Sequence, residues 1–561
     1  MLKGHPRGLL VAFFANMGER FGYYTMLAIF VLYLQAKFGY STAEAGQIYG
    51  GFLFGIYFLP LLGGIIADNW LGYGKTIILG TIVMFIGYAM LAVPDMGIGM
   101  VIGSLSVISL GTGFFKGNLQ VLVGNMYDDP KYDANRDNAF NIFYMGINIG
   151  AFFAPSAAEG ISNYILGKHH LVYDARVPHW AHEFLDGKLN DTSEYLAVAM
   201  KQLGDKFTNL TDFSNHYIQV LSQSYNAGFA IAAISMVISL LIFVGFRKYY
   251  KNADLTEKQK SLSEAHKDQV IELSKEQIKQ RLIALFLVFS VVIFFWMAFH
   301  QNGFTMTIFA RDYTQHIVGR YTFILFDLKA LLPILAAIIG VVLIINKKIK
   351  STGKIIGAIL VVAGIGVAYW AIGTFNDEMP ITPAKFQHFN PIFIVFLTPV
   401  VVGFFTWLRR KSKEPSSPKK IGFGMIITAI SYALMMYIAY SFSHGYSPKD
   451  LSASGGVVPT NMLASPYWLI GTYFSLTIAE LFLSPMGISF VSKVSPPKMK
   501  GLMQGGWLGA TALGNLGAGL VGYFWDKLEI WQFFGILVGL TLLSALFIFS
   551  VMKLLEKAAS S

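Results

Sequence analysis

The sequence has no cysteine, and only 13% of its 561 residues carry a charged side chain. Without cysteine the chain forms no disulfide, no cysteine-ligated metal centre and no thiol nucleophile. The charged fraction is about half of the roughly 25% found in soluble globular domains. Because 54% of the residues are hydrophobic, a chain of this length cannot bury its apolar surface in water. These deficits exclude a cytosolic enzyme, a disordered chain and a nucleic-acid-binding domain.

The hydrophobic residues are gathered in long runs. A helix needs about 20 mostly apolar residues to cross a bilayer, and fourteen segments of the chain approach that length. Their continuous apolarity differs from the alternating pattern of about ten residues in a membrane barrel strand. We therefore predict an all-α membrane protein with helices near 8–35, 46–67, 74–93, 98–123, 139–165, 223–246, 282–310, 326–346, 353–374, 389–408, 421–442, 466–491, 502–525 and 530–552.

The basic residues indicate how these helices cross the membrane. The formal net charge is +11, and most lysines and arginines fall in alternate loops, above all in 247–281 and 409–420. Cytoplasmic loops carry such an excess of basic residues. We expect both termini to be cytoplasmic, in the cell membrane and most simply a bacterial inner membrane. The positive charge thus reports orientation and does not call for a nucleic-acid partner.

The predicted helices divide into two sets around a charged, helix-prone linker at 247–281. Residues 1–246 hold six helices and a long external loop at 166–222, and residues 282–561 hold eight. Two of the eight, within 326–374, form an apolar hairpin that we interpret as a peripheral insertion. The remaining plan of six plus six helices is typical of transporters whose substrate site lies between two repeated halves.

The external loop contains a histidine pair with metal-ligand spacing. His179 and His182 would share one helical face if the segment were helical. A solvated surface is the simpler interpretation, and we predict no metal site.

Ionisable residues inside the predicted helices are few. The ones we single out as functional candidates are Glu19, Arg20, Lys116, His300 and Glu480. A charge at the bilayer centre costs about 2.5–3.5 kcal/mol on insertion scales, so such residues usually face a cavity and serve function. The first half contributes the cations Arg20 and Lys116, and the second half contributes the anion Glu480. A zwitterion with separated charges, such as a short peptide, would fit between them, although Glu19 and Arg20 could also simply neutralise each other.

These residues lie within a pattern that resembles a known family. Glu19-Arg20-Phe21-Gly22-Tyr23-Tyr24 is similar to the ExxERFxYY motif of the proton-dependent oligopeptide transporter (POT/PTR) family of the major facilitator superfamily. Further segments resemble the family's motifs in the same order along the chain: Gly63–Gly72 with Lys75, Gly111–Lys116, Phe143–Gly150, Asn390-Pro391, Glu480–Gly487 and Trp507.

The resemblance implies a major facilitator fold and proton-coupled uptake of di- and tripeptides by alternating access. It implies that Arg20 and Lys116 hold the peptide carboxylate, and that Glu480 with Asn390 holds the amino terminus. The pocket would be lined by Tyr24, Tyr57, Asn148, Ser484 and Trp507. The family resemblance also implies that the chain is not an enzyme and needs no cofactor beyond the coupling proton; we expect a monomer.

The sequence departs from the family's pattern at positions that matter for coupling. Asn16 replaces the first motif glutamate, and Leu27 stands where the family has a further arginine. His300 occupies a position where an acidic residue is frequent. We predict that coupling involves Glu19, Glu480 and His300, because histidine titrates near physiological pH. A packing role for His300 is equally compatible with the sequence.

Asp68 and Lys75 bracket a predicted cytoplasmic turn, where they could pair with a neighbouring helix and act as a gate, or serve static packing. Two other functions remain open. The same fold could carry an amino acid, a modified peptide or another organic solute. A membrane-embedded enzyme would need a catalytic constellation, and neither HExxH nor GxSxG occurs in the sequence.

Overall fold

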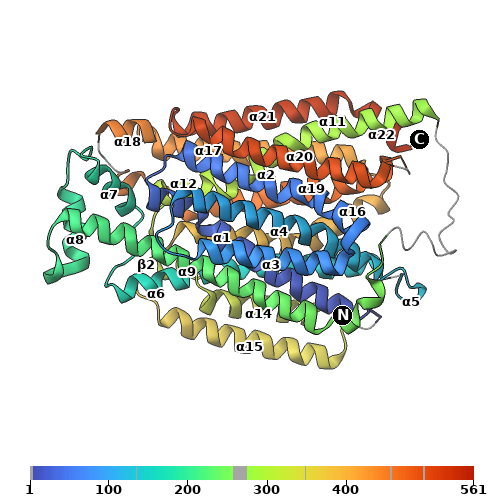
Figure 1. Ribbon diagram of the computed structural model, residues 1–561, viewed down its shortest axis with the longest axis horizontal. Helices are drawn as coiled ribbons and strands as arrows, with labels where there is room; N and C mark the ends of the chain where they lie inside the picture. The colour runs from blue at the N-terminus through green and yellow to red at the C-terminus, as the bar shows by residue number, and fades with distance from the viewer. Residues whose placement is uncertain are drawn as a thin grey trace.

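The computed structural model describes residues 4–133, 135–256, 274–347, 349–454, 458–496 and 499–560. It is a bundle of long, roughly aligned helices (Figure 1). Twelve of the described helices are long and apolar enough to cross a membrane. Two further long helices, α6 (Arg136–Lys168) and α20 (Lys500–Val521), pack among them. This arrangement is compatible with the fourteen predicted spans.

The first half of the bundle contains α6 and five other long helices: α1 (Gly8–Phe38), α2 (Thr42–Ile66), α3 (Tyr73–Leu91), α4 (Ile98–Asn125) and α9 (Leu210–Gly245). Helix α1 packs against α6 and α9, and α4 packs against α2 and α3. Glycine permits the closest of these approaches. A Cβ atom on Gly63 of α2 would lie 2.0 Å from the carbonyl oxygen of Gly113 of α4. Small residues at such crossings let helix backbones meet inside a membrane.

The second half contains α20 and α11 (Lys275–Phe299), α16 (Phe389–Arg410), α17 (Ser417–Ser443), α19 (Pro466–Val494) and α21 (Ile530–Ser550). Helix α17 packs between α19 and α21, and α20 packs on α11. A short C-terminal helix, α22 (Met552–Ser560), ends the chain. Between the halves, η3 (Arg247–Tyr249) and η4 (Lys251–Ala253) follow α9. Residues 257–273 of the predicted linker lie outside the described residues.

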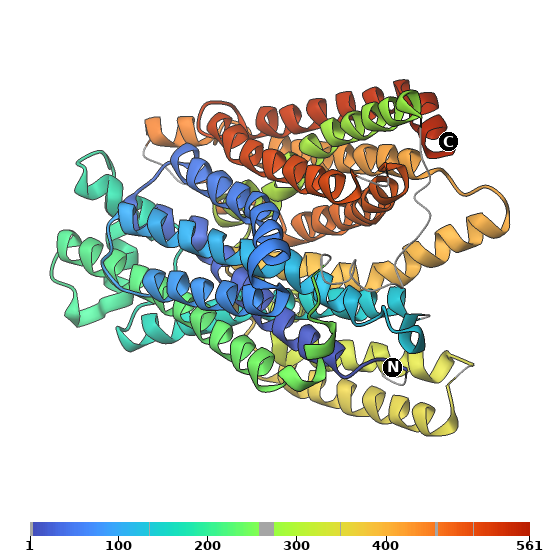
Figure 2. The ribbon, with the colours of Figure 1, turned by 45° about the vertical axis from the view of Figure 1, so that its right-hand side comes forward.

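The predicted hairpin is formed by α14 (Leu328–Ile345) and α15 (Ser351–Gly373), which lie at the edge of the bundle (Figures 1 and 2). Its outer side chains are strongly exposed, with 74% of Val362 and 70% of Ile345 accessible. Exposed aliphatic side chains on membrane-length helices are expected where helices face lipid. A two-stranded ribbon of β1 (Ile317–Gly319) and β2 (Glu378–Pro380) closes the root of the hairpin.

The segment predicted as a long external loop is folded. Helix α6 continues to Lys168 and α9 begins at Leu210, and α7 (Val177–Leu185) and α8 (Ser193–Leu203) lie between them. The physical reason is an aromatic core that a hydropathy scan for spans does not detect. Its members are buried and make ring contacts with one another: Trp180, Tyr195, Phe213 and Tyr217.

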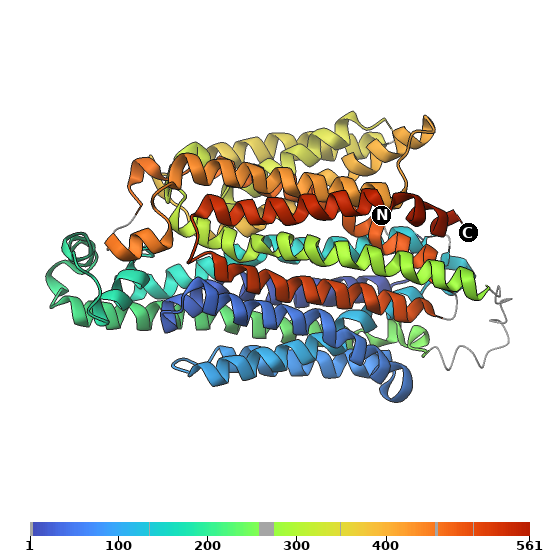
Figure 3. The ribbon, with the colours of Figure 1, turned by 90° about the horizontal axis from the view of Figure 1, so that it is seen from above.

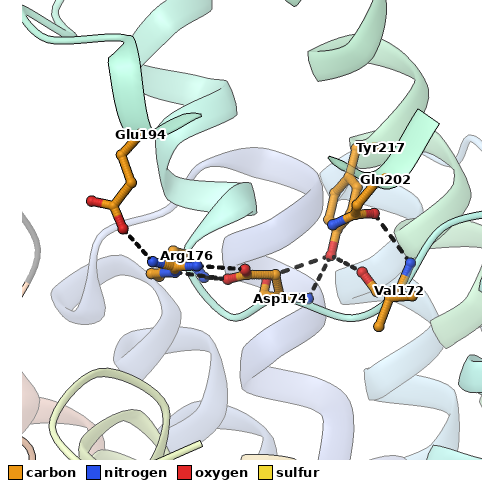
Figure 4. A network of polar contacts seen from close by, with 6 residues as sticks. All are labelled: Val172, Asp174, Arg176, Glu194, Gln202 and Tyr217. Atoms are coloured by element: carbon orange, nitrogen blue, oxygen red, sulfur yellow. Dashed lines mark hydrogen bonds and ion pairs between the residues drawn. The ribbon is translucent and has the colours of Figure 1, made fainter. Parts of the chain in front are cut away.

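A polar network fastens the start of this subdomain (Figure 4). The Arg176 guanidinium donates to Asp174 Oδ2 at 2.8 Å and to Glu194 Oε1 at 2.5 Å. The Tyr217 hydroxyl accepts from the Asp174 backbone N–H at 2.9 Å and donates to the Val172 carbonyl at 3.1 Å. Burial opposes ionisation of Asp174, but the hydrogen bonds from Arg176 outweigh it and lower the pKa of the carboxyl.

The bundle has two distinguishable ends. Helices α7 and α8 protrude at one end, and both chain termini lie toward the other (Figures 1 and 3). We call these the α7–α8 end and the termini end.

Candidate functional site

The first-half ionisable residues begin with an ion pair on α1. Arg20 Nε donates to Glu19 Oε2 and Arg20 Nη2 donates to Glu19 Oε1, both at 2.5 Å. Both side chains are buried, with 5% and 1% exposed. The Arg20 guanidinium also lies over the Tyr23 ring, 4.7 Å from its centroid. In this conformation Glu19 and Arg20 therefore neutralise each other, which was one of the alternatives that the sequence left open.

Lys116 on α4 is arranged differently. Its Nζ atom lies 3.6 Å from the centroid of the Tyr57 ring on α2, a cation–π contact. Among the described residues, no carboxylate lies within ion-pair distance of Lys116. Its charge is therefore more available to a bound anion than the charge of Arg20.

His300 lies next to this group, at the end of α11. Its ring is 6.1 Å from the Tyr57 ring and 5.2 Å from the Trp296 ring. His300 Nδ1 lies 3.2 Å from the Trp296 carbonyl oxygen. Because a carbonyl only accepts, this contact places a proton on Nδ1 and leaves Nε2 as the nitrogen that can exchange a proton.

The second-half anion is held by a neighbouring amide. Asn390 Nδ2 on α16 donates to Glu480 Oε2 on α19 at 3.0 Å and to Thr477 Oγ1 at 3.1 Å. Ser484 follows Glu480 by one helical turn, which puts it on the same face of α19. The contact fixes the carboxylate of Glu480 without neutralising its charge.

Two tyrosines lie near charged residues of both halves. Tyr24 and Tyr57 each lie within interaction range of Arg20, Glu19 and Glu480. The structure therefore brings cations from the first half and the anion of the second half to one region around these rings.

The other predicted lining residues are less closely tied to this group. Asn148 is half-buried, and its Nδ2 donates to the Tyr144 carbonyl of its own helix at 3.3 Å. Trp507 on α20 is buried against Gly487 of α19, where an added Cβ would lie 2.0 Å from the ring. The ring needs glycine opposite it, which explains the last position of the Glu480–Gly487 segment.

At the candidate gate, Asp68 and Lys75 do not form the predicted charge pair with a neighbouring helix among the described residues. The Tyr73 hydroxyl donates to Asp68 Oδ1 at 2.5 Å, and Lys75 is exposed with no ion pair among the described residues. The turn is instead held by Asp254, whose Oδ1 accepts from the Gly74 N–H at 2.8 Å. No sequence pattern predicts this contact, because the two residues are far apart along the chain.

The histidine pair of the α7–α8 segment has ordinary partners. His182 Nε2 lies 2.8 Å from the Ala36 carbonyl oxygen, and His179 Nε2 lies 3.5 Å from Glu183. Within the described ranges, no group of three or more histidine, aspartate or glutamate side chains could hold a metal ion.

Three polar contacts join the two halves near the α7–α8 end, and sequence reasoning missed them. Lys385 Nζ lies 2.6 Å from Glu159 Oε2, and both side chains are about nine-tenths buried. Arg311 Nη1 donates to Gln35 Oε1 at 2.7 Å, and the Ala43 N–H donates to Asp526 Oδ2 at 3.0 Å. Glu159 stands inside the span predicted over 139–165, so its charge was a signal that could have marked it.

Comparisons with known proteins agree with the fold. A family model described as the POT family matches residues 74–265 and 368–532. A peptide transporter of Yersinia enterocolitica, YePEPT, is 28% identical over 540 residues, covering 92% of this chain and 88% of the relative. A di-/tripeptide transporter of Lactococcus lactis subsp. cremoris is 25% identical over 578 residues, covering 96% and 95%.

Solved structures share the fold. A crystal structure of peptide transporter POT in complex with sulfate superposes with a TM-score of 0.66 at 22% identity, covering 100% of this chain and 96% of the other. A POT family transporter in complex with 5-aminolevulinic acid gives a TM-score of 0.66 at 20% identity, covering 98% and 97%. Because the family model spans most of both halves, the chain belongs to the POT family of peptide transporters and is a multi-pass membrane transporter, not an enzyme.

Proposed function

We propose that the protein imports di- and tripeptides together with protons by alternating access. The observation that carries the proposal is the convergence of Lys116 and Arg20 from one half and Glu480 from the other on Tyr24 and Tyr57. A short peptide has one carboxylate and one ammonium group, separated by its backbone, and matches this distribution of charge. The relatives named as di- and tripeptide transporters support the same substrate class.

Each end of the peptide has a candidate partner. Lys116 would attract the carboxylate first, because Arg20 already shares two hydrogen bonds with Glu19. Glu480, held by Asn390, would bind the ammonium group. Tyr24, Tyr57, Asn148, Ser484 and Trp507 would contact the remainder. Recognition of termini and backbone leaves side chains largely unread, so selectivity would be broad.

Glu19, Glu480 and His300 are the candidate groups for proton coupling. Asn16 cannot titrate, and its Nδ2 lies 3.4 Å from the Phe143 carbonyl oxygen, so it joins α1 to α6. A proton on Glu19 would release Arg20 from its ion pair and make its guanidinium available to the peptide carboxylate. No cofactor other than the proton is required by this scheme.

The proposed orientation follows from the basic loops, which gather at the termini end. That end would be cytoplasmic, in a bacterial inner membrane, and the α7–α8 end external. Contacts between the halves near the external end then correspond to a carrier closed toward the outside. We propose that one monomer forms a complete carrier, since both walls of the site come from one chain.

The test is uptake of labelled dialanine by purified protein in liposomes with an imposed inward proton gradient. We expect accumulation that a protonophore abolishes, and loss of accumulation in Lys116→Gln and Glu480→Gln. Lys413→Gln, on an exposed loop, is the matched charge control and should accumulate peptide normally. Failure to transport any di- or tripeptide would refute the substrate class, and accumulation without a proton gradient would refute the coupling.

His300 has its own test. Uptake by His300→Gln is measured across pH, and a changed pH profile with less gradient-driven accumulation is expected. An unchanged profile with full accumulation would remove His300 from the mechanism.

A second solute class has a specific observation in its favour. Arg20 is engaged by Glu19, and Leu27 replaces a further cation, so the site has less free positive charge than the family motif provides. A related structure binds 5-aminolevulinic acid, a solute smaller than a peptide. Competition of dialanine uptake by free amino acids and modified peptides separates the two classes, because only a peptide carrier should favour dialanine over alanine.

A further inference from the structure

The buried ion pair between Glu159 and Lys385 lies at the seam between the two halves. Glu159 is on α6, and Lys385 is on η7 (Pro383–His388), the short helix that precedes α16. The Thr382 hydroxyl also donates to Glu159 Oε1 at 2.8 Å. A buried charge left without its partner is strongly unfavourable. The two halves therefore cannot part at this point without rehydrating both charges.

Helix η7 packs against the root of the inserted hairpin. Lys385 Nζ lies 5.4 Å from the centroid of the Phe323 ring, on α13 (Arg320–Phe323). Phe326, fully buried before α14, contacts the rings of Phe386 and Phe389 at 5.0 and 5.4 Å. His388 Nε2 donates to the carbonyl of Leu325, next to Phe326, at 3.0 Å. The residues that enter the hairpin thus form the wall against which η7 packs.

The hairpin root is closed on itself. Strands β1 and β2 pair between Ile317 and Pro380, Arg320 and Asp377 form an ion pair, and the Phe323 ring contacts the Phe375 ring edge-on at 5.0 Å. The chain leaves the bundle and returns at neighbouring points. The insertion is therefore positioned to fix the direction of η7 without entering the peptide site.

We propose that the root of the inserted hairpin positions Lys385, and that the Lys385–Glu159 ion pair holds the α7–α8 end of the carrier closed. Lys385 and Glu159 are positioning residues in this scheme, since they act on the equilibrium between carrier states and not on the peptide. The insertion then has a role in transport, although its helices lie at the periphery. That the closed side faces the exterior rests on the proposed function. The ion pair and its test do not depend on peptide transport.

The absence of cysteine from the chain allows a direct measurement of opening. Ser156 lies on the same face of α6 as Glu159, one turn deeper, and its hydroxyl is buried without a partner among the described residues. In a Ser156→Cys protein, a membrane-impermeant maleimide should react slowly from the α7–α8 side. Ser193→Cys, at an exposed position on α8, reports full access, and Ser104→Cys, at a fully buried position on α4, reports none.

In the Ser156→Cys background, Glu159→Gln and Lys385→Gln should each raise the labelling rate about tenfold, because each leaves a buried charge unpaired. The charge exchange Glu159→Lys with Lys385→Glu should return the rate toward that of the parent. Lys188→Gln, which removes an exposed ion pair within the α7–α8 subdomain, should leave it unchanged. Equal labelling rates of the parent and both single variants would refute the proposal that the Lys385–Glu159 ion pair holds this end closed.

The role of the hairpin is tested by Phe326→Ala, which should raise labelling as Lys385→Gln does. Val362→Ala, on the exposed side of α15, is the matched control and should have no effect. If size-exclusion chromatography shows that Phe326→Ala does not fold, Phe326→Leu replaces it, with a smaller increase expected. Rapid labelling in Glu159→Gln and Lys385→Gln but not in a folded Phe326 variant would refute the role of the hairpin.

Discussion

The two ends of the bundle differ in where their polar contacts lead. At the α7–α8 end they join the halves, as in Glu159–Lys385 and Arg311–Gln35. At the termini end they stay within one half, as in Glu414 with Lys420, or join a half to the linker, as in Gly74 with Asp254. Among the described residues, no ion pair joins the halves there, and α2 meets α20 through an apolar contact of Leu61 with Gly505. If the carrier works by the proposed alternating access, this difference predicts that the termini end is the side that opens.

Within the second half, the termini end is held together by charged groups. Glu414 binds Arg409 at 2.5 Å and Lys420 at 2.6 Å, and Glu556 of α22 binds Ser416 and Lys419. These contacts stabilise the half as a rigid body. They do not oppose its movement relative to the other half.

The largest expected effect comes from adding a methyl group where α2 and α20 are in close contact. A Cβ on Gly519 would lie 2.1 Å from the Gly46 carbonyl oxygen, whereas a Cβ on Gly509 of the same helix meets nothing within 4 Å. Gly519→Ala should therefore reduce peptide uptake by roughly tenfold or more, because overpacking costs about 1–3 kcal/mol. Gly509→Ala should transport normally in the same liposome assay. Equal uptake by both variants would show that transport does not require close contact between α2 and α20 at Gly519.

The next effect compares arginines at the two ends. Arg311→Gln loses the contact with Gln35 and leaves Asp312 without its partner. We expect a decrease of uptake of about fivefold, since partly buried pairs are worth more than exposed ones. Arg409→Gln breaks an exposed pair and should stay within about twofold of the parent. The initial rate of uptake measures both, and a larger loss for Arg409→Gln would reverse the comparison.

A third change separates stability from sidedness. Asp254→Ala removes the acceptor of the Gly74 N–H and should lower the free energy of unfolding by about 1–3 kcal/mol. Thermal unfolding of the purified protein would show a lower midpoint, while labelling of Ser156→Cys stays unchanged. Increased labelling would mean that the termini end also controls the opposite side. Asp186→Ala, in an exposed ion pair, is the control for the loss of a carboxylate.

The smallest effect concerns pH. The hydrogen bond from Arg409, followed by the contact with Lys420, lowers the pKa of Glu414 to about 2 from its ordinary 4.5. A lowered carboxyl pKa contributes stability above the unfolded value and loses it as pH falls toward the folded value. The difference in unfolding midpoint between the parent and Glu414→Gln should therefore be constant above about pH 5 and shrink toward pH 3. A difference that grows on acidification would contradict this.

Much of the fold could be predicted from the sequence, because apolar length is a local property. The apolar hairpin and the long helices were confirmed. The prediction of a loop at 166–222 was wrong, because this segment forms helices around a core of aromatic residues. Those residues, such as Trp180 and Tyr195, are separated by polar ones and do not form an apolar run. The candidate site residues were predicted from charges inside spans, and their role stays a prediction. Their pairing was open, since spacing along the chain cannot distinguish an Arg20 bound to Glu19 from one that faces the substrate.

By itself the sequence determined that this chain crosses a membrane many times without thiol chemistry, because composition and run length decide whether a segment is stable in lipid. It also determined which few ionisable residues lie within that lipid-spanning part. Only the tertiary structure decided that Lys116 meets Tyr57, that Asn390 holds Glu480 and that Lys385 reaches Glu159. Those contacts join residues from 59 to 226 positions apart, and only the packing of helices brings such residues together.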